Sequence, residues 1–135
     1  MNIDILLRPG DIKEKVLKEK VAVVFDVLRA TSTIVTALAK GCRAVIPVEE
    51  IDEAKAIERE LKKGCFLGEI VFNILGRNFK EIDVLLGGER GGERIPGFPY
   101  GNSPLEYTEK VVKNKILVLT TTNGTRTIRL ATRGS

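Results

Sequence analysis

Residues 21–48 read VAVVFDVLRATSTIVTALAKGCRAVIPV, and this stretch predicts a strand, a helix and a further strand. Residues 21–27 are a continuous β-branched run, which is typical of a central strand buried on both faces of a parallel sheet. The hydroxyl side chains of residues 31–33 then precede apolar residues at helical spacing, which predicts a helix. Gly41 stands where the left-handed residue that ends a helix is expected. Ala44–Val48 is the next strand, and Pro47 places it at an edge or near a strand end because proline cannot donate to the ladder.

The rest of the chain continues this alternation of strands and helices. Further strands are predicted at residues 2–7, 82–86 and 116–119. Further helices are predicted at residues 51–63, at residues 103–112 after the capping pattern of Ser103, Pro104 and Glu106, and from Thr127 onwards. Residues 65–81 match neither the helical nor the strand period of apolar residues and are interpreted as an irregular insertion. Residues 87–102 are too rich in glycine and proline for regular structure. The pattern predicts a single α/β domain over residues 1–135, with a mostly parallel sheet between flanking helices in three α/β/α layers.

Composition limits the chemistry available to this chain of 135 residues. The net charge of +4 is dispersed among many acidic residues and aromatic residues make up 5%, so small anions are favoured as partners over nucleic acid. Histidine is absent, so carboxylates, hydroxyls and arginines must carry any catalysis. No apolar run is long enough to span a membrane and the start lacks the layout of a secretory signal, which predicts a cytoplasmic protein. The two cysteines are expected to be reduced.

In open α/β sheets, ligands bind beyond the carboxyl ends of the strands, and this rule selects three segments. The first is FDVLRATST at residues 25–33. Asp26 could hold Mg²⁺ or act as a nucleophile, Thr31 and Ser32 could hold an anion at the start of the helix, and Arg29 could bind phosphate or sulfonate. The alternative is structural, with Asp26 binding loop amides and the hydroxyls capping the helix.

The second and third segments follow two later strands. LGGERGGERIPGFPYGNS at residues 86–103 combines paired glycines with Glu89, Arg90 and further charges, which suits a site for metal and phosphate; the alternative is a flexible surface loop. TTTNGTR at residues 120–126 has the make-up of an anion-binding nest, although its residues are also common in turns. The glycine spacing fits neither the Walker A nor the dinucleotide-binding pattern.

Taken together, FDVLRATSTIVTALAKG, LLGGERGGERIPGFPYGNSPLEYT and LVLTTTNGTR resemble the 2-phosphosulfolactate phosphatase family. The resemblance implies an α/β fold and a Mg²⁺-dependent enzyme that converts 2-phospho-3-sulfolactate to 3-sulfolactate and phosphate, a step of coenzyme M biosynthesis. The expected ligand is therefore a small phosphorylated and sulfonated acid.

The resemblance also assigns roles to individual residues. It implies Asp26 and Glu89 as metal ligands and, together with Arg29 and Arg90, as catalytic residues. The implied substrate-binding residues are Thr31, Ser32, Asn102, Ser103, Thr121, Thr122, Asn123, Gly124 and Arg126.

The sequence departs from the family pattern in two respects. Residues 65–81 form a longer connection than the family usually has, and the chain stops at Ser135, where family members continue with about as much sequence again. This indicates the N-terminal portion of a longer phosphatase, with a truncated, non-catalytic anion-binding domain or an enzyme for a related phosphorylated hydroxy acid as alternatives. A free sheet edge or the insertion could also support a homo-oligomer.

Overall fold

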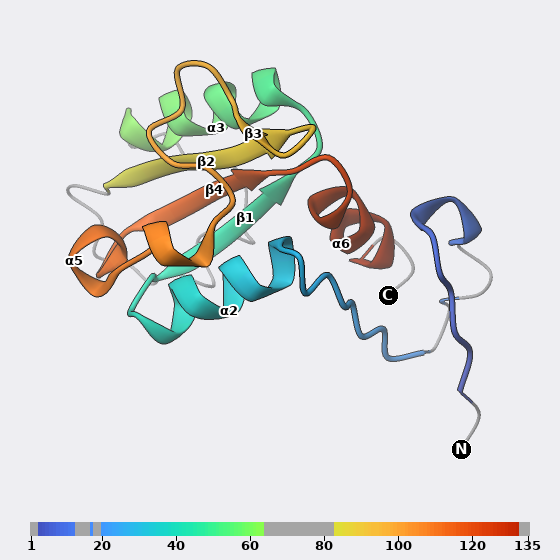
Figure 1. Ribbon diagram of the computed structural model, residues 1–135. Helices are drawn as coiled ribbons and strands as arrows, with labels where there is room; N and C mark the ends of the chain where they lie inside the picture. The colour runs from blue at the N-terminus through green and yellow to red at the C-terminus, as the bar shows by residue number, and fades with distance from the viewer. Residues whose placement is uncertain (1–2, 13–16, 18–19, 64–82, 133–135) are drawn as a thin grey trace.

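The computed structural model describes residues 3–12, 17, 20–63 and 83–132. Within them lies a four-stranded sheet in the order β1-β4-β2-β3 (Figure 1). Its strands are β1 (Ala44–Val48), β2 (Val84–Arg90), β3 (Glu93–Arg94) and β4 (Ile116–Thr120). β1 and β2 both pair with β4 in parallel, and the short β3 pairs antiparallel with β2. The predicted α/β class with a mostly parallel sheet is confirmed.

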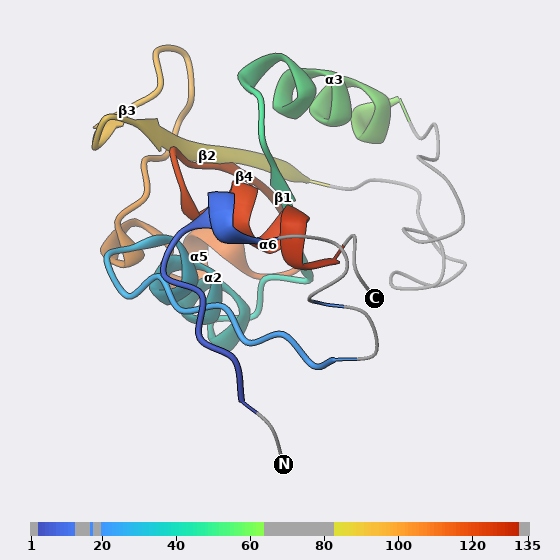
Figure 2. The same ribbon diagram turned by 90° about the vertical axis from the view of Figure 1, so that its right-hand side faces the viewer.

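Helices cover both faces of the sheet. The helical elements are η1 (Pro9–Asp11), α2 (Ala30–Ala39), α3 (Ile51–Lys62), η2 (Pro104–Glu106), α5 (Glu109–Val112) and α6 (Gly124–Thr132). Figure 1 shows α3 on one face and α2 and α5 on the other, while α6 lies beyond the carboxyl ends of the strands. Figure 2 shows η1 beside α6, which it contacts.

The central strand β4 separates two apolar cores. Ile116 and Val118 belong to the core under α3, whereas Leu117 and Leu119 belong to the core on the side of α2 and α5. This alternation follows from the twofold period of a strand, which sends successive side chains to opposite faces. Because both faces are buried, the positions at which the strands end are firmly held.

Several predicted elements are confirmed. β1 is an edge strand, as Pro47 requires, and α3 runs almost to its predicted end. Gly41 has a φ of +92° just after α2, a conformation that glycine adopts without strain. The start of α2 differs from the prediction, because Arg29 is the N-cap residue and no side chain caps the helix.

The predicted strands at residues 2–7 and 21–27 are wrong for the residues that the structure describes. Residues 3–7 and 21–26 have no assigned secondary structure, and most of their apolar side chains are exposed. A strand needs a neighbouring ladder, and among the described residues neither segment has one. The central position belongs to β4 instead.

The glycine-rich segment is more regular than predicted, because β2 continues through both glycines to Arg90 and turns into β3. A Cβ atom at Gly87 would overlap the hydroxyl of Tyr107, and one at Gly88 would overlap the carbonyl oxygen of Thr120. The two glycines therefore allow close packing inside the sheet, where the composition suggested a loop.

Two predicted helices have different bounds. The helix expected at residues 103–112 is divided into η2 and α5, because Tyr107 turns inward and donates a hydrogen bond from its hydroxyl to the carbonyl oxygen of Gly101. The last helix begins at Gly124 and not at Thr127. The insertion predicted at residues 65–81 lies outside the described residues. In the part of the chain that is described, no helix is long and apolar enough to cross a membrane.

Candidate active site

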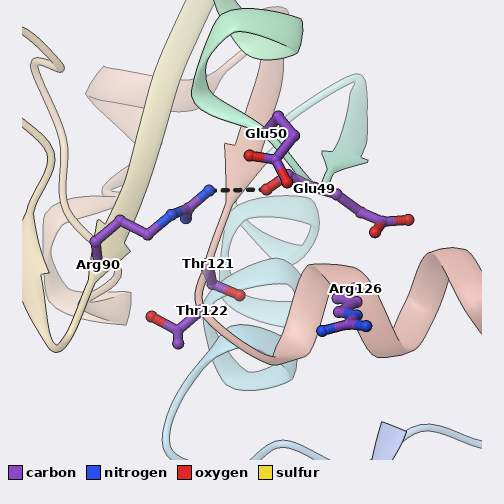
Figure 3. Close-up of a pocket in the computed structure, with 6 residues that line it drawn as sticks. All are labelled: Glu49, Glu50, Arg90, Thr121, Thr122 and Arg126. Atoms are coloured by element: carbon purple, nitrogen blue, oxygen red, sulfur yellow. Dashed lines mark hydrogen bonds between the residues drawn. The ribbon is translucent and has the colours of Figure 1, made fainter. Parts of the chain in front are cut away.

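The parallel strands β1, β4 and β2 end at the same edge of the sheet, and a pocket opens there beside the start of α6 (Figure 3). It has a volume of about 350 Å³. Its lining residues are Glu49, Glu50, Arg90, Thr121, Thr122 and Arg126. The pocket therefore combines two guanidinium groups, two hydroxyls and two carboxylates.

Arg90 joins the ends of all three parallel strands. Its Nη2 donates to the carbonyl oxygen of Glu49 at 2.7 Å and to Oγ1 of Thr120 at 2.9 Å. Its Nη1 donates to the carbonyl oxygen of Glu89 at 2.8 Å. Arginine has five N–H donors, so two remain, and no carboxylate of the described residues forms an ion pair with it. Arg90 thus brings to the pocket a positive charge that is fixed by three hydrogen bonds and has no ion pair among the described residues.

Glu89 is buried and fastens the two loops that border the pocket. Its Oε1 accepts a hydrogen bond from the amide of Thr122 at 2.7 Å. Its Oε2 accepts from the amide of Gly92 at 2.8 Å and from the hydroxyl of Thr122 at 2.9 Å. Burial alone would raise the pKa of Glu89, but these hydrogen bonds and the charge of Arg90 outweigh it and lower the pKa below 4.5. The ionised carboxylate therefore holds Thr122 in place.

The loop from β4 into α6 is fixed by reciprocal hydrogen bonds. The amide of Thr121 donates to Oγ1 of Thr125 at 3.0 Å, and the amide of Thr125 donates to Oγ1 of Thr121 at 3.1 Å. Gly124 leaves no room for a side chain, because a Cβ atom there would overlap Ala30 and Asp26. Arg126 follows on the first turn of α6, where it is exposed and has no ion pair within the described chain.

Asp26 lies against the first residue of α6. Its Oδ2 is the carboxylate atom closest to Gly124, and no hydrogen bond to this carboxylate is present in the described residues. Its backbone is held by Thr31, whose Oγ1 accepts from the Asp26 amide at 2.9 Å and whose amide donates to the Asp26 carbonyl oxygen at 3.1 Å. Asp26 is thus adjacent to the pocket through α6, although it is not one of the lining residues.

The structure therefore gathers four predicted residues, Arg90, Thr121, Thr122 and Arg126, around one pocket, with Glu89 behind them. The other predicted residues lie around this edge, where they either form hydrogen bonds within the fold or have no partner among the described residues. Arg29 is the N-cap residue of α2, the Ser32 hydroxyl donates to the Val27 carbonyl oxygen, and the Asn123 carbonyl oxygen accepts from the Thr127 hydroxyl.

Asn102 and Ser103 lie on the α2 side of the same sheet edge. The carbonyl oxygen of Asn102 accepts from the hydroxyl of Thr33 at 2.9 Å, while its buried Oδ1 has no partner in the described residues. Ser103 forms the predicted capping box of η2 with Glu106. The substrate-binding roles predicted for Asn102 and Ser103 remain predictions.

Sequence reasoning missed Glu49 and Glu50, which follow β1 directly. The rule about the carboxyl ends of parallel strands would have selected them, but it was applied only to the segments after residues 25, 86 and 119. Among the described residues, no group of three or more His, Cys, Asp or Glu side chains could hold a metal ion. The metal role predicted for Asp26 and Glu89 remains a prediction.

Comparisons with known proteins agree on one family. Residues 6–135 match the model of the family described as 2-phosphosulpholactate phosphatase. A probable 2-phosphosulfolactate phosphatase from Clostridium acetobutylicum is 49% identical over 129 residues, which are 96% of this chain and 47% of that protein. Proteins with the same name from Clostridium novyi and Clostridium tetani are 47% and 46% identical, over 95% and 97% of this chain and 46% and 48% of their own lengths. The chain spans about half the length of the curated relatives it matches.

Proposed function

This chain belongs to the 2-phosphosulpholactate phosphatase family, and on that premise we propose that the protein hydrolyses the phosphate ester of 2-phospho-3-sulfolactate. The products would be 3-sulfolactate and phosphate, and the reaction would serve coenzyme M biosynthesis. We place the reaction in the cytoplasm, in keeping with the free thiol of Cys42.

The observation that carries this proposal is the pair of guanidinium groups, Arg90 and Arg126, that line the pocket. Neither arginine forms an ion pair inside the described chain, and Arg126 stands on the first turn of α6, at the positive end of that helix. A phosphate ester with further acidic groups would satisfy the free N–H groups of the two arginines, because guanidinium groups bind phosphoryl and sulfonate oxygens through paired hydrogen bonds. Glu89 favours the same outcome by holding Thr122 at the edge of the pocket.

We propose Mg²⁺ as the cofactor, with Asp26 as its protein ligand. The carboxylate of Asp26 has no partner in the described residues, and Mg²⁺ commonly uses one or two carboxylates together with substrate phosphate and water. Glu89 fits a metal less well, because its oxygens already accept three hydrogen bonds. When bound, the ion would withdraw charge from the phosphoryl oxygens.

The proposal is tested by measuring phosphate release from 2-phosphosulfolactate with and without Mg²⁺. We expect release that depends on Mg²⁺ and that falls by about 100-fold or more in Asp26→Asn, in line with the loss of one electrostatic group in an active site. The matched control is Asp83→Asn, which makes the same change at the opposite, amino end of β2 and should keep full activity. Release that is independent of Mg²⁺, or unaffected by Asp26→Asn, would remove the metal role from the proposal.

The second candidate is a non-catalytic anion-binding domain. It is favoured by one observation, namely that the two guanidinium groups lining the pocket can bind phosphate whether or not the ester is hydrolysed. Calorimetric titration with inorganic phosphate separates the two functions. Phosphate binding that weakens in Arg90→Lys, without hydrolysis of the ester at any Mg²⁺ concentration, would support this candidate.

A further inference from the structure

We propose that Glu50 is a catalytic residue that protonates the leaving oxygen of the phosphate ester. Glu50 is the N-cap residue of α3, and its side chain lines the pocket with Arg90 and Arg126. The inference rests on the proposed phosphatase function and deepens it by assigning the proton transfer.

The chemistry of the ester requires a proton donor. An aliphatic alcohol leaves phosphorus as an alkoxide, a strong base, unless a proton reaches its oxygen as the bond breaks. The chain contains no histidine, and arginine stays protonated under all ordinary conditions. Among the six residues that line the pocket, the side chains that can exchange a proton are Glu49 and Glu50.

The arrangement of the carboxylates favours Glu50. In Figure 3 its carboxyl group lies on the side of the pocket where Arg90 reaches the end of β1, whereas the side chain of Glu49 extends away from Arg90. Glu49 serves the pocket through its backbone, whose carbonyl oxygen accepts from Arg90 and from the Thr120 hydroxyl. Glu89 lies behind Thr122 with both carboxylate oxygens in hydrogen bonds.

The fold makes no use of the Glu50 carboxylate within the described residues. It forms no ion pair there, and it does not cap α3 although it occupies the N-cap position. Helices prefer Ser, Thr, Asp or Asn at that position, so helix stability does not explain a glutamate. The Glu50 carboxyl group, which is exposed and lines the same pocket as Arg90 and Arg126, is therefore available to a ligand.

The step balances without an outside reagent. The bond between phosphorus and the ester oxygen breaks, its electron pair stays on that oxygen, and the proton of the Glu50 carboxyl group moves to it to give the alcohol. Water forms the new bond to phosphorus and loses a proton, which restores the Glu50 carboxyl group. Arg90 and Arg126 hold the phosphoryl oxygens during the transfer.

The test compares two esters that differ in their need for a proton. The leaving group of 2-phosphosulfolactate is an alkoxide, whereas 4-nitrophenyl phosphate releases a stable phenolate that departs without protonation. We expect Glu50→Gln to lower kcat for 2-phosphosulfolactate by about 100-fold, within the usual range for general acid catalysis, and to change kcat for 4-nitrophenyl phosphate by less than about threefold. The control is Asp52→Asn, which removes one charge from the same first turn of α3 without touching the pocket.

The possible results lead to different conclusions. An equal fall with both esters would mean that Glu50 only shapes the pocket, and unchanged rates would mean that it takes no part; either result overturns the inference while the proposed function stands. No hydrolysis of either ester by the unchanged chain would overturn the proposed function and the inference together. Far-UV circular dichroism of each variant establishes that the chains compared are folded.

Discussion

β4 and residues 21–28 are both apolar runs rich in β-branched residues, yet they have opposite environments. Ile116, Leu117, Val118 and Leu119 are each 0% exposed, between two cores. Val21 is 93% exposed and Phe25 is 83% exposed, in a segment without secondary structure. The difference is that β4 has a parallel partner on each side, whereas residues 21–28 belong to no ladder in the described structure.

The two runs also lead into the site in different ways. After β4, Glu89 and Thr125 fix the backbone of Thr121 and Thr122 through several hydrogen bonds. After residue 25, Asp26 is held by two hydrogen bonds to Thr31. A similar apolar pattern can therefore precede a loop that side chains of other elements hold in place, or one that is held by a single neighbour five residues later.

The largest expected effect separates a buried leucine from an exposed one. Leu117→Ala should lower the free energy of unfolding by about 3 kcal/mol, because it leaves a cavity in a fully packed core. Leu28→Ala removes the same atoms from a side chain that is 88% exposed and should change stability by less than about 0.5 kcal/mol. Urea unfolding followed by circular dichroism measures both, and comparable losses would contradict the contrast between the two runs.

A smaller effect on stability is expected at Glu89 of β2, which holds the loop that follows β4. Glu89→Gln should lower the free energy of unfolding by about 2 kcal/mol, because the backbone amides of Gly92 and Thr122 lose a charged hydrogen-bond acceptor. The folded state lowers the pKa of Glu89, so its contribution is complete above the ordinary value of 4.5 and is lost as pH falls through the folded pKa.

Chemical unfolding measured at several pH values should therefore show the difference between the original chain and Glu89→Gln shrinking below about pH 4.5, the ordinary value for this group. Glu93→Gln, on the exposed strand β3, is the control and should give a difference that is close to zero at every pH. If the difference in the free energy of unfolding between the original chain and Glu89→Gln grew as the pH fell, this result would contradict the lowered pKa.

The smallest effect is expected in the exposed run. Phe25→Ser should shift the free energy of unfolding by less than about 0.5 kcal/mol, because the ring makes little buried contact in the described structure. It should also reduce the binding of an apolar fluorescent dye, since the exposed ring offers apolar surface. A loss as large as that of Leu117→Ala would show that residues 21–28 are packed in solution.

Much of the fold followed from local patterns. The spacing of apolar residues predicted α3 and β4 nearly to their ends, and Pro47 correctly predicted an edge strand. The errors have physical causes outside any local window. β2 continues through Gly87 and Gly88 because Tyr107 and Thr120 come close to them from other parts of the chain.

The residues of the site were likewise predicted only in part from the sequence. The sequence indicated Arg90, Thr121, Thr122 and Arg126, because hydroxyls, glycines and arginines after strands are typical of anion sites. The pocket residues Glu49 and Glu50 were missed, since two acidic residues before a helix are also a common helix start.

The sequence by itself determined the class of fold, the family and the types of group that could act on a phosphate ester. Those properties depend on residue type and on spacing along the chain. The tertiary structure alone decided that β4 is central, that Glu89 fastens Thr122 and that Glu50 faces the same pocket as Arg90 and Arg126. These facts depend on contacts between residues that lie far apart in the chain. Strand pairing and close packing establish those contacts, and local propensity does not encode them.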